Sequence, residues 1–238
     1  MPTTIELGET TLDVVRKDIK NVHLSVYPPT GTVRISAPTR MNLATIRLFA
    51  ISKLGWIGQQ QKALREQERE GQREYLDRES HYVWGKRYLL KLVEADAAPS
   101  VQIHHSRLRL CVRSGTSKPM REEIVSSWYR QLLRDAVPSL IKAWEPRLKV
   151  TVARFYVQQM KTRWGSCNPA ASTLRLNTAL ATKPKECLEY LVVHEMVHLL
   201  EPTHGPRFLA LMDRTMPHWR DTRELLNRLP ARHERWNY

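Results

Sequence analysis

The sequence has few of the features that mark secreted or membrane-spanning proteins. Only 3 of its 238 residues are cysteines, and their odd number and spacing fit neither a disulfide framework nor a metal site. No apolar run reaches the ~18 residues that a membrane-crossing helix needs, and the N-terminus lacks a basic segment leading into a hydrophobic one. We therefore expect a soluble, cytoplasmic protein without a membrane partner.

Internal repeats, low-complexity tracts and phosphate-cradling glycine loops are also missing from the sequence. The 9 glycines are scattered and form no loop of the GxxxxGK[ST] type. The sequence thus gives no indication of a nucleotide-binding loop or a repeat protein. At 238 residues the chain is long enough to bury a sizeable core as one large or two small domains.

Acidic residues are in the minority, and the excess of basic residues is spread along the chain. The sequence holds 38 Lys and Arg against 24 Asp and Glu, a formal net charge of +14. Residues 1–118 and 119–238 each hold 19 basic and 12 acidic residues, so each half carries +7. A chain this basic can associate with phosphate backbones, for instance through its C-terminal tail, or can simply be a basic soluble enzyme. Both interpretations remain open.

The most specific feature of the sequence is an HExxH motif within an apolar stretch. His194 and His198 stand four residues apart, and Glu195 follows the first of them. Residues four apart on a helix lie on one face with Cβ atoms about 6 Å apart, close enough for two imidazoles to share one ion. Glu195 lies about 100° around the helix from His194, so it borders the metal without ligating it. The apolar neighbours predict that this helix is buried.

A proline and a third histidine complete the predicted site. Pro202 ends the helix within a turn of His198, and a loop can bring His204 back to the metal. Three nitrogens leave the fourth tetrahedral position of zinc open for water, as in catalytic sites. Glu195 can then take a proton from the zinc-bound water and return it to a leaving amine. The sequence therefore predicts a metallopeptidase with one Zn²⁺ and a peptide or protein substrate.

Two other interpretations of the motif remain open from the residues alone. HExxH is short and can occur by chance, in which case the histidines are hydrogen-bonded core residues and His204 is a loop or capping residue. The zinc can also be structural, within a non-catalytic binding module. In that case Glu195→Gln leaves the function intact, whereas His198→Ala unfolds the protein.

Five segments of the chain together resemble a known family. They are 160–167 (MKTRWGSC), 176–180 (LNTAL), 194–198 (HEMVH), 203–208 (THGPRF) and 216–219 (MPHW). In combination they are similar to the YgjP-like metallopeptidases, relatives of the SprT and WLM groups of minimal zinc peptidases, over roughly residues 10 to 230. The resemblance implies a zinc ion held by the three histidines with the motif glutamate as general base. Kinship with SprT and WLM, together with the basic charge, also raises the alternative of a protease that acts on DNA-bound proteins.

Two positions depart from what this resemblance implies, and neither is a metal ligand. The family usually has a small polar residue after the third histidine, where this chain has Gly205. An acidic residue is common in the family where this chain has His218. The sequence leaves open whether His218 is a surface or packing residue or lies near the substrate.

The first half of the chain is expected to contain hairpins and one long helix. Residues 22–26 and 33–36 alternate in polarity across a Pro-Pro-Thr-Gly turn, which predicts a hairpin. A helix is expected to begin near Asn42 and to continue as a charged, solvated helix from Gln59 to Arg78. Residues 101–104 and 108–112 predict a second hairpin.

The second half is expected to form the catalytic domain. A helix is predicted over Glu122–Trp144 with a kink near Pro138, followed by strands within 150–160 and 173–176 and by a zinc-binding helix opening at Pro184. The fold class expected is therefore α+β: a minimal zincin-like domain with an HExxH helix and a small antiparallel sheet, preceded by a hairpin and helix region. We place the N-terminal region at 1–113, the catalytic domain at 119–230 and a basic tail at 231–238.

The turn before the zinc helix supplies candidate substrate-binding residues. Gly165 permits close backbone approach, and Trp164 can pack under the site. Arg163 and Asn177 carry donors that can stabilise a developing oxyanion. The segment 174–176 is our candidate for an edge strand that pairs with an extended peptide. The structural alternative is that these residues only support the zinc helix.

Overall fold

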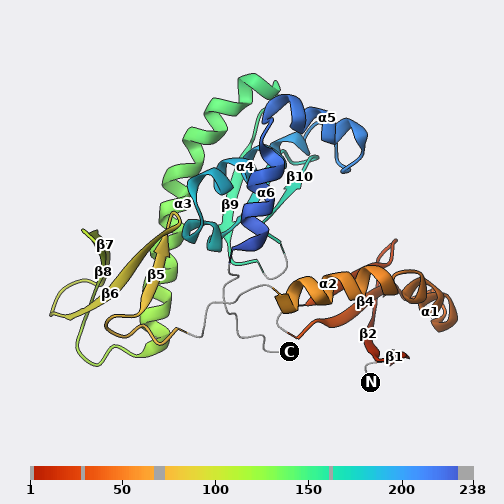
Figure 1. Ribbon diagram of the computed structural model, residues 1–238, viewed down its shortest axis with the longest axis horizontal. Helices are drawn as coiled ribbons and strands as arrows, with labels where there is room; N and C mark the ends of the chain where they lie inside the picture. The colour runs from red at the N-terminus through yellow and green to blue at the C-terminus, as the bar shows by residue number, and fades with distance from the viewer. Residues whose placement is uncertain (1–2, 28–29, 67–72, 161–162, 230–238) are drawn as a thin grey trace. The chain divides into compact units, whose positions relative to one another are not determined.

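The computed structural model describes residues 3–27, 30–66, 73–160 and 163–229. The chain divides between Glu70 and Gly71 into two compact units, which we describe separately (Figure 1). The described residues form three small sheets and six α-helices, a mixed α+β fold. None of the helices in these ranges is both long enough and apolar enough to cross a bilayer.

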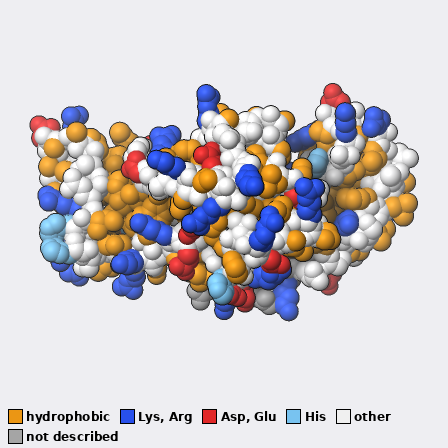
Figure 2. All heavy atoms as spheres, turned by 90° about the horizontal axis from the view of Figure 1, so that it is seen from above, with side chains coloured by type: hydrophobic (Ala, Val, Ile, Leu, Met, Phe, Trp, Pro, Cys, Tyr) orange, Lys and Arg blue, Asp and Glu red, His pale blue; other side chains and the backbone are white. Residues whose placement is uncertain are grey.

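Charged side chains are distributed broadly over the surface. In Figure 2 the Lys and Arg side chains are scattered across the visible face and interspersed with apolar and acidic ones. This agrees with the even division of basic residues between the two halves of the sequence.

The first unit is a four-stranded sheet packed against two helices. Strand β2 pairs in parallel with β4, while β1 and β3 add to the two sides as antiparallel partners. The predicted first hairpin is confirmed as β3 and β4, with Val26 opposite Val33; its turn residues 28–29 lie outside the described residues. The strands are β1 (Thr3–Leu7), β2 (Thr10–Lys17), β3 (His23–Tyr27) and β4 (Thr32–Pro38).

The first helix of this unit begins where the sequence predicts, but two helices separated at Lys53 stand where one long helix was expected. The side chain of Asn42 accepts a hydrogen bond from the Thr45 N–H at 2.8 Å and so caps α1 (Leu43–Ser52). Helix α2 (Leu54–Glu66) follows, and Ile46, Ala50 and Ile57 bury their side chains against the sheet. The predicted continuation of a charged helix to Arg78 is wrong for residues 73–78, which are non-helical; residues 67–72 lie outside the described residues.

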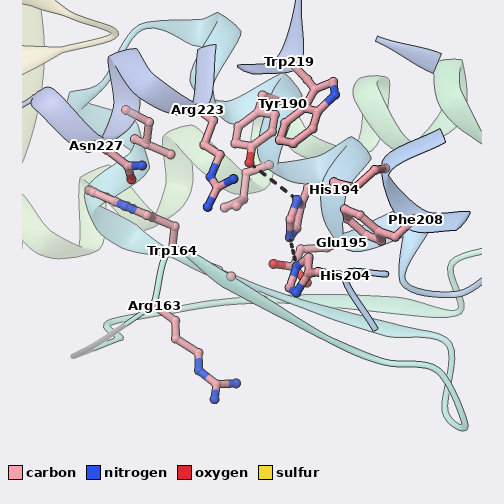
Figure 3. Close-up of a pocket in the computed structure, with 14 residues that line it drawn as sticks. Arg163, Trp164, Tyr190, His194, Glu195, His204, Phe208, Trp219, Arg223 and Asn227 are labelled. Carbon is pink, nitrogen blue, oxygen red and sulfur yellow. Dashed lines mark hydrogen bonds between the residues drawn. The ribbon is translucent and has the colours of Figure 1, made fainter. Parts of the chain in front are cut away.

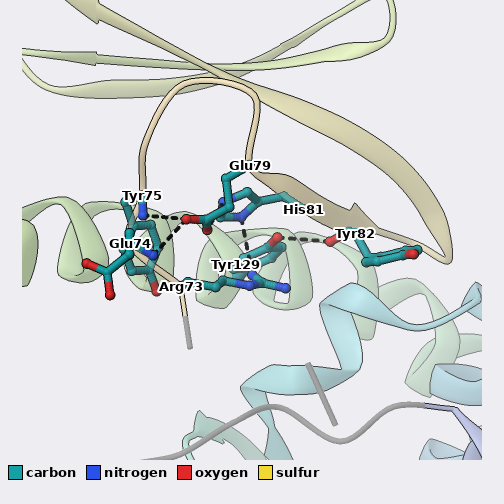
Figure 4. Close-up of polar contacts among 7 residues, drawn as sticks. All are labelled: Arg73, Glu74, Tyr75, Glu79, His81, Tyr82 and Tyr129. Atoms are coloured by element: carbon teal, nitrogen blue, oxygen red, sulfur yellow. Dashed lines mark hydrogen bonds and ion pairs between the residues drawn. The ribbon is translucent and has the colours of Figure 1, made fainter. Parts of the chain in front are cut away.

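Residues 73–78, which precede the second sheet, are not helical because polar contacts hold them in another conformation (Figure 4). A carboxylate oxygen of Glu79 accepts hydrogen bonds from the backbone N–H groups of Glu74 and Tyr75, both at 2.7 Å. The other oxygen lies 3.0 Å from Nε2 of the fully buried His81. Tyr75 is 1% exposed, so its ring lies in the core. Its φ of 56° lies in the left-handed region, which a right-handed α-helix does not permit.

The sheet of the second unit repeats the topology of the first. Its order is β5-β6-β8-β7, with β6 and β8 parallel and the outer pairs antiparallel, as in β1-β2-β4-β3. In both sheets the first hairpin turns through two residues that include a glycine of positive φ, Gly8 and Gly85. The strands are β5 (Ser80–Val83), β6 (Lys86–Glu94), β7 (Ser100–His104) and β8 (Arg107–Val112), and β7 and β8 confirm the second predicted hairpin.

This repetition is one of topology and does not alter the finding that the sequence shows no internal repeat. The repeat lies in the backbone pairing of the strands, with different side chains in the two copies. Strand pairing is compatible with many apolar sequences that alternate in polarity, so two copies can share a topology without sharing residue identities.

A long helix connects the second sheet to the remainder of this unit. Helix α3 (Lys118–Leu148) includes the predicted span Glu122–Trp144, begins after Ser117 and contains Pro138 in its interior. Residues 114–117, between the two regions that we placed from the sequence, lead directly into it, and the Ser114 hydroxyl donates to Glu94 at 2.9 Å. The division into compact units falls at residue 70 rather than at this segment. The proposed domain division at 113–119 and the tail at 231–238 remain predictions.

The third sheet is mixed, which corrects the expectation of an antiparallel sheet. Its order is β10-β11-β9, with β10 antiparallel and β9 parallel to β11. The predicted edge strand at 174–176 is therefore wrong, because β11 is hydrogen-bonded on both sides and lies in the centre. The strands are β9 (Arg154–Gln158), β10 (Gly165–Asn168) and β11 (Thr173–Asn177).

Helices close the second unit around this sheet. The 3-10 helix η1 (Thr178–Thr182) leads into α4 (Lys185–Val197), whose side chains are buried along nearly its whole length. This α4 begins after Pro184, as predicted. Figure 1 shows α4 between α3 and α6, and α4 contacts α3, α5, α6, β10 and β11. The last helices are α5 (Pro206–Thr215) and α6 (Trp219–Arg228).

Candidate metal centre

Three histidines converge at the end of α4. His194 lies in the last turn of the helix, His198 is its C-terminal capping residue, and His204 stands directly before the start of α5. The Nε2 atom of His204 lies 3.0 Å from that of His194 and 3.1 Å from that of His198. The ligand atoms of all three residues lie within 4.8 Å of one another. The loop after α4 therefore returns the third histidine to the first two.

These distances fit a shared ion. Zinc–nitrogen bonds of about 2.0–2.1 Å in a tetrahedral arrangement separate neighbouring nitrogens by about 3.3 Å. The separations of 3.0 and 3.1 Å in this cluster are close to that value. The donor set consists of three imidazoles, which suits zinc among the biological metals.

Hydrogen bonds on the far sides of two rings set their orientation. Nδ1 of His198 lies 3.0 Å from the carbonyl oxygen of Glu201, which can only accept a hydrogen bond. In the neutral ring the proton is therefore on Nδ1, and Nε2 presents its lone pair to the cluster. Nδ1 of His194 lies 3.5 Å from the hydroxyl of Tyr190, one helical turn earlier. Such contacts on the second nitrogen are typical of metal-binding histidines.

The surroundings of the cluster favour the neutral form of His194 and His204. Burial, together with the neighbouring His198 and His204, lowers the pKa of His194 to about 3. Burial and His198 also lower the pKa of His204. A neutral imidazole is the form that binds a metal ion.

Glu195 places a buried carboxyl group beside the histidines. Its side chain is 4% exposed. Burial raises the pKa of Glu195 to about 8, while the positive charge of Arg163 acts in the opposite direction. A carboxyl group with a pKa near neutrality is suited to accepting and returning a proton.

Gly165, at the start of β10, provides the space for this carboxyl group. A Cβ atom added to Gly165 would lie 2.7 Å from Oε1 of Glu195 and 3.1 Å from the backbone oxygen of Arg175. Carbon and oxygen atoms do not approach so closely without displacement. The absence of a side chain at Gly165 thus makes room for the Glu195 carboxyl group, and its predicted role in substrate binding remains a prediction.

A pocket of about 490 Å³ opens beside His194, Glu195 and His204 (Figure 3). One side is formed by Trp164 and Gly165 and the opposite side by residues of α4 and α6. The lining residues are Arg163, Trp164, Gly165, Tyr190, Leu191, His194, Glu195, His204, Phe208, Leu209, Trp219, Arg223, Leu226 and Asn227. The histidine cluster is therefore reachable from solvent.

Comparison with known proteins identifies the family. The sequence matches the family described as "YgjP-like, metallopeptidase domain" over residues 20–229. The chain belongs to the YgjP-like metallopeptidases. It is also similar to a solved structure, the metallopeptidase zymogen abylysin of Pyrococcus abyssi, at 17% identity over 40% of this chain and 99% of that chain, with a TM-score of 0.36. Comparison with curated proteins finds no match.

The four predicted substrate-binding residues of this YgjP-like chain lie in different environments. Trp164 and Gly165 line the pocket. Arg163 also belongs to the lining, but Figure 3 shows its guanidinium pointing away from the histidines. Asn177 is buried outside the lining; its amide donates to the carbonyl oxygens of Met160 at 2.8 Å and Arg163 at 2.9 Å. Asn177 thus fixes the segment that leads into β10.

Several pocket residues were not anticipated from the sequence. Tyr190 and Trp219 stack with ring centroids 6.3 Å apart and planes inclined by 7°. The ring of Phe208 lies 4.7 to 5.0 Å from all three imidazoles. Arg223 comes from α6. Tyr190 was detectable, because it stands one turn before His194 on the same helix face; the others depend on how α5 and α6 pack on α4.

Other residues singled out in the sequence lie apart from the cluster. His218 precedes α6 with its Nδ1 3.8 Å from a carboxylate oxygen of Asp221, and both side chains are at least 82% exposed. Burial and the charge of Glu195 raise the pKa of Cys167 to about 11. That thiol is protonated at neutral pH, which makes Cys167 a poor nucleophile.

Proposed function

We propose that this YgjP-like protein is a zinc-dependent peptidase in which His194, His198 and His204 bind one zinc ion and Glu195 is the general base. The observation that carries the proposal is the convergence of three imidazole nitrogens beside a buried carboxyl group at the edge of an open pocket. A closed structural site would have a fourth protein ligand. Among the described residues, no further His, Cys, Asp or Glu joins the cluster.

The chain's own groups have defined tasks in this proposal. When bound, the zinc ion supplies a polarised water molecule with a pKa of about 7. The carboxylate of Glu195 accepts a proton from the attacking water and later donates it to the leaving nitrogen. Tyr190 and the backbone of Glu201 orient two of the imidazoles. Phe208 covers the cluster on one side and limits the access of solvent.

Strand β10 is the best candidate for binding the peptide backbone. It pairs with β11 on one side, and no other described strand occupies its second side. An extended peptide can add to such an edge through main-chain hydrogen bonds. Gly165 begins this strand next to the carboxylate of Glu195, so a peptide bound along β10 would pass the reacting groups.

The proposal is tested by metal analysis joined to digestion of casein and of a peptide library. We expect the purified protein to hold one equivalent of zinc and to cleave peptide bonds. Glu195→Gln is expected to keep the zinc and to lose about 10²–10⁴-fold in rate. The matched control is Glu186→Gln, which changes an exposed carboxylate in the first turn of the same helix. Unchanged cleavage by Glu195→Gln would contradict the general-base role and support a structural zinc module.

A second candidate function is a peptidase that acts on proteins bound to nucleic acid. Arg147, Lys149 and Arg214 surround a hollow of about 440 Å³ that has no acidic lining residue. A phosphate backbone could neutralise these cations, with binding that weakens steeply as salt rises. DNA should then stimulate cleavage in low salt, and replacing the three residues with Gln should abolish the stimulation. Equal cleavage rates with and without DNA would exclude this candidate.

A further inference from the structure

The pocket beside the histidines has two cationic lining residues, Arg163 and Arg223. Among the described residues that line it, Glu195 is the single acid, and it belongs to the catalytic centre. The two arginines of the lining differ in direction. Arg163 points away from the cluster, whereas Arg223 lies next to Tyr190 on the opposite wall (Figure 3).

Arg223 differs from the other arginines of α6. Arg220 is hydrogen-bonded to both carboxylate oxygens of Asp213, one of these contacts being 3.2 Å. Arg228 lies 3.5 Å from a carboxylate oxygen of Glu224. Among the described residues, Arg223 has no acidic partner within ion-pair distance. A guanidinium carries five donors in a fixed fork, so Arg223 can still bind a planar anion with two hydrogen bonds.

Arg223 lies beside an aromatic residue of the pocket wall. Its guanidinium carbon lies 5.9 Å from the centre of the Trp219 ring. Trp219 is held in turn by its stacking on Tyr190 and by a 2.7 Å hydrogen bond from its indole N–H to Asp213. The wall therefore presents a cation at the edge of an apolar aromatic surface.

We infer that Arg223 determines specificity by binding a carboxylate of the substrate. This inference rests on the proposed peptidase function. In a peptide, the groups that match a forked cation are the side chains of Asp and Glu and the C-terminal carboxylate. Tyr190 and Trp219 can pack against the apolar part of the same substrate residue. The substrates selected by this wall are thus acidic peptides or peptides with a free C-terminus.

Binding to the zinc-loaded Glu195→Gln protein tests the inference without hydrolysis. The probes are acetylated hexapeptides in an alanine background, one set with Glu or Gln at successive positions and amidated ends, the other with a free or an amidated C-terminus. Titration followed by tryptophan fluorescence gives the dissociation constants, since Trp164 and Trp219 line the pocket. At one position we expect the carboxylate form to bind about tenfold more tightly than its neutral partner. A preference within the Glu and Gln set would show that Arg223 binds an acidic side chain. A preference within the set with free or amidated ends would show that it binds the C-terminal carboxylate.

A second substitution, added to the Glu195→Gln protein, shows whether the preference for the carboxylate depends on the guanidinium of Arg223. Arg223→Gln should bring the ratio of the two dissociation constants to about one, whereas Arg223→Lys should retain part of it because the charge remains. Arg228→Gln removes an arginine of the same helix that does not line the pocket, and it should leave the ratio unchanged. Thermal unfolding of each variant shows whether it is folded.

The results separate this inference from the proposed function. Equal affinity of charged and neutral peptides for the Glu195→Gln protein would overturn the inference. A preference that persists in Arg223→Gln would also overturn it, because the carboxylate would then bind the zinc ion or another cation. If Arg223-dependent binding is found but the protein with Glu195 intact hydrolyses no peptide of either set, the peptidase function fails while the carboxylate site stands.

Discussion

The backbone of Gly165 lies against the carboxyl group of Glu195, so closely that a methyl group on Gly165 would reach within 2.7 Å of Oε1. The two residues are 30 positions apart and come from an edge strand and a buried helix. Their contact places the glutamate at the base of the pocket and brings the edge of β10 next to it. The strand proposed to bind the substrate and the proposed general base are thus positioned by one contact.

Replacing Gly165 with Ala should displace the Glu195 carboxyl group. The second close neighbour of the added methyl is the backbone oxygen of Arg175, which cannot move easily within the sheet. We expect kcat/KM to fall by about 10²-fold while zinc is retained, because a shift of about 1 Å in a catalytic group has an effect of that size. Gly58→Ala is the control, since a Cβ there meets no atom within 4 Å. Wild-type activity in Gly165→Ala would argue against the role of Glu195.

Tyr190→Phe should weaken metal binding without unfolding the protein. The substitution keeps the ring that stacks on Trp219 and removes the hydroxyl 3.5 Å from Nδ1 of His194. Loss of an orienting partner of a metal-binding histidine reduces affinity by about 10–100-fold, and we expect the lower end for this long contact. Competition with a chromophoric chelator measures the effect. Tyr156→Phe, on β9 and 40% exposed, is the matched control and should bind zinc as the wild type does.

Asn177→Ala should destabilise the protein and lower its activity. Asn177 is 6% exposed, and its amide group donates hydrogen bonds to the carbonyl oxygens of Met160 and Arg163. Leaving buried acceptors unsatisfied costs about 1–3 kcal/mol each, so the free energy of unfolding in urea should fall by an amount in that range or above it. Asn168→Ala, at the exposed end of β10, removes only a 3.3 Å hydrogen bond from the Ala171 N–H and should change it by less than about 0.5 kcal/mol. Equal effects of the two substitutions would contradict the positioning role of Asn177.

In the metal-free protein, the contribution of Glu195 to stability should be lost with rising pH. Its pKa in the folded protein, about 8, lies above the ordinary value of 4.5. The folded state therefore holds a proton that the unfolded state releases between these values, so the free energy of unfolding falls as pH rises through this window. Glu195→Gln lacks this proton. In the presence of EDTA, the melting temperature of Glu195→Gln minus that of the wild type should grow from pH 4.5 to 8 and then level off.

The pH experiment has a clear contrary outcome. The histidines titrate in both proteins, so their contributions cancel in the difference. A difference between the two melting temperatures that does not change across the window would mean that the carboxyl group is solvated in the metal-free protein. Added zinc should reduce the difference, because a nearby cation favours the ionised carboxylate.

Local patterns of the chain predicted the elements that carry the histidines. Residues four apart on a helix always share a face, so the pairing of His194 and His198 follows from their spacing alone. Pro184 marked the start of α4. Pro202 indicated that the chain leaves the helix before His204. The family resemblance drawn from the same segments is confirmed by the match over residues 20–229.

Predictions that depended on strand order failed, since alternation along a strand does not say which strands become its neighbours. The segment 174–176 has the composition of a strand, but only the pairing of β11 with both β9 and β10 shows that it is central. The repeated sheet topology escaped detection for the same reason. Residues 73–78 were expected to be helical from their charge, yet the contacts of Glu79 and the burial of Tyr75 impose another conformation.

By itself the sequence determined the family, the α+β class, and a helix that places two histidines and a glutamate in fixed angular relation, because helical geometry is local and acts within a few residues. Only the tertiary structure decided that β10 is the edge beside Glu195, that Asn177 is buried away from the pocket, and that Arg223 faces it. Those relationships depend on side chains and strands from distant parts of the chain, whose packing must satisfy every buried surface at once and cannot be read from any one segment.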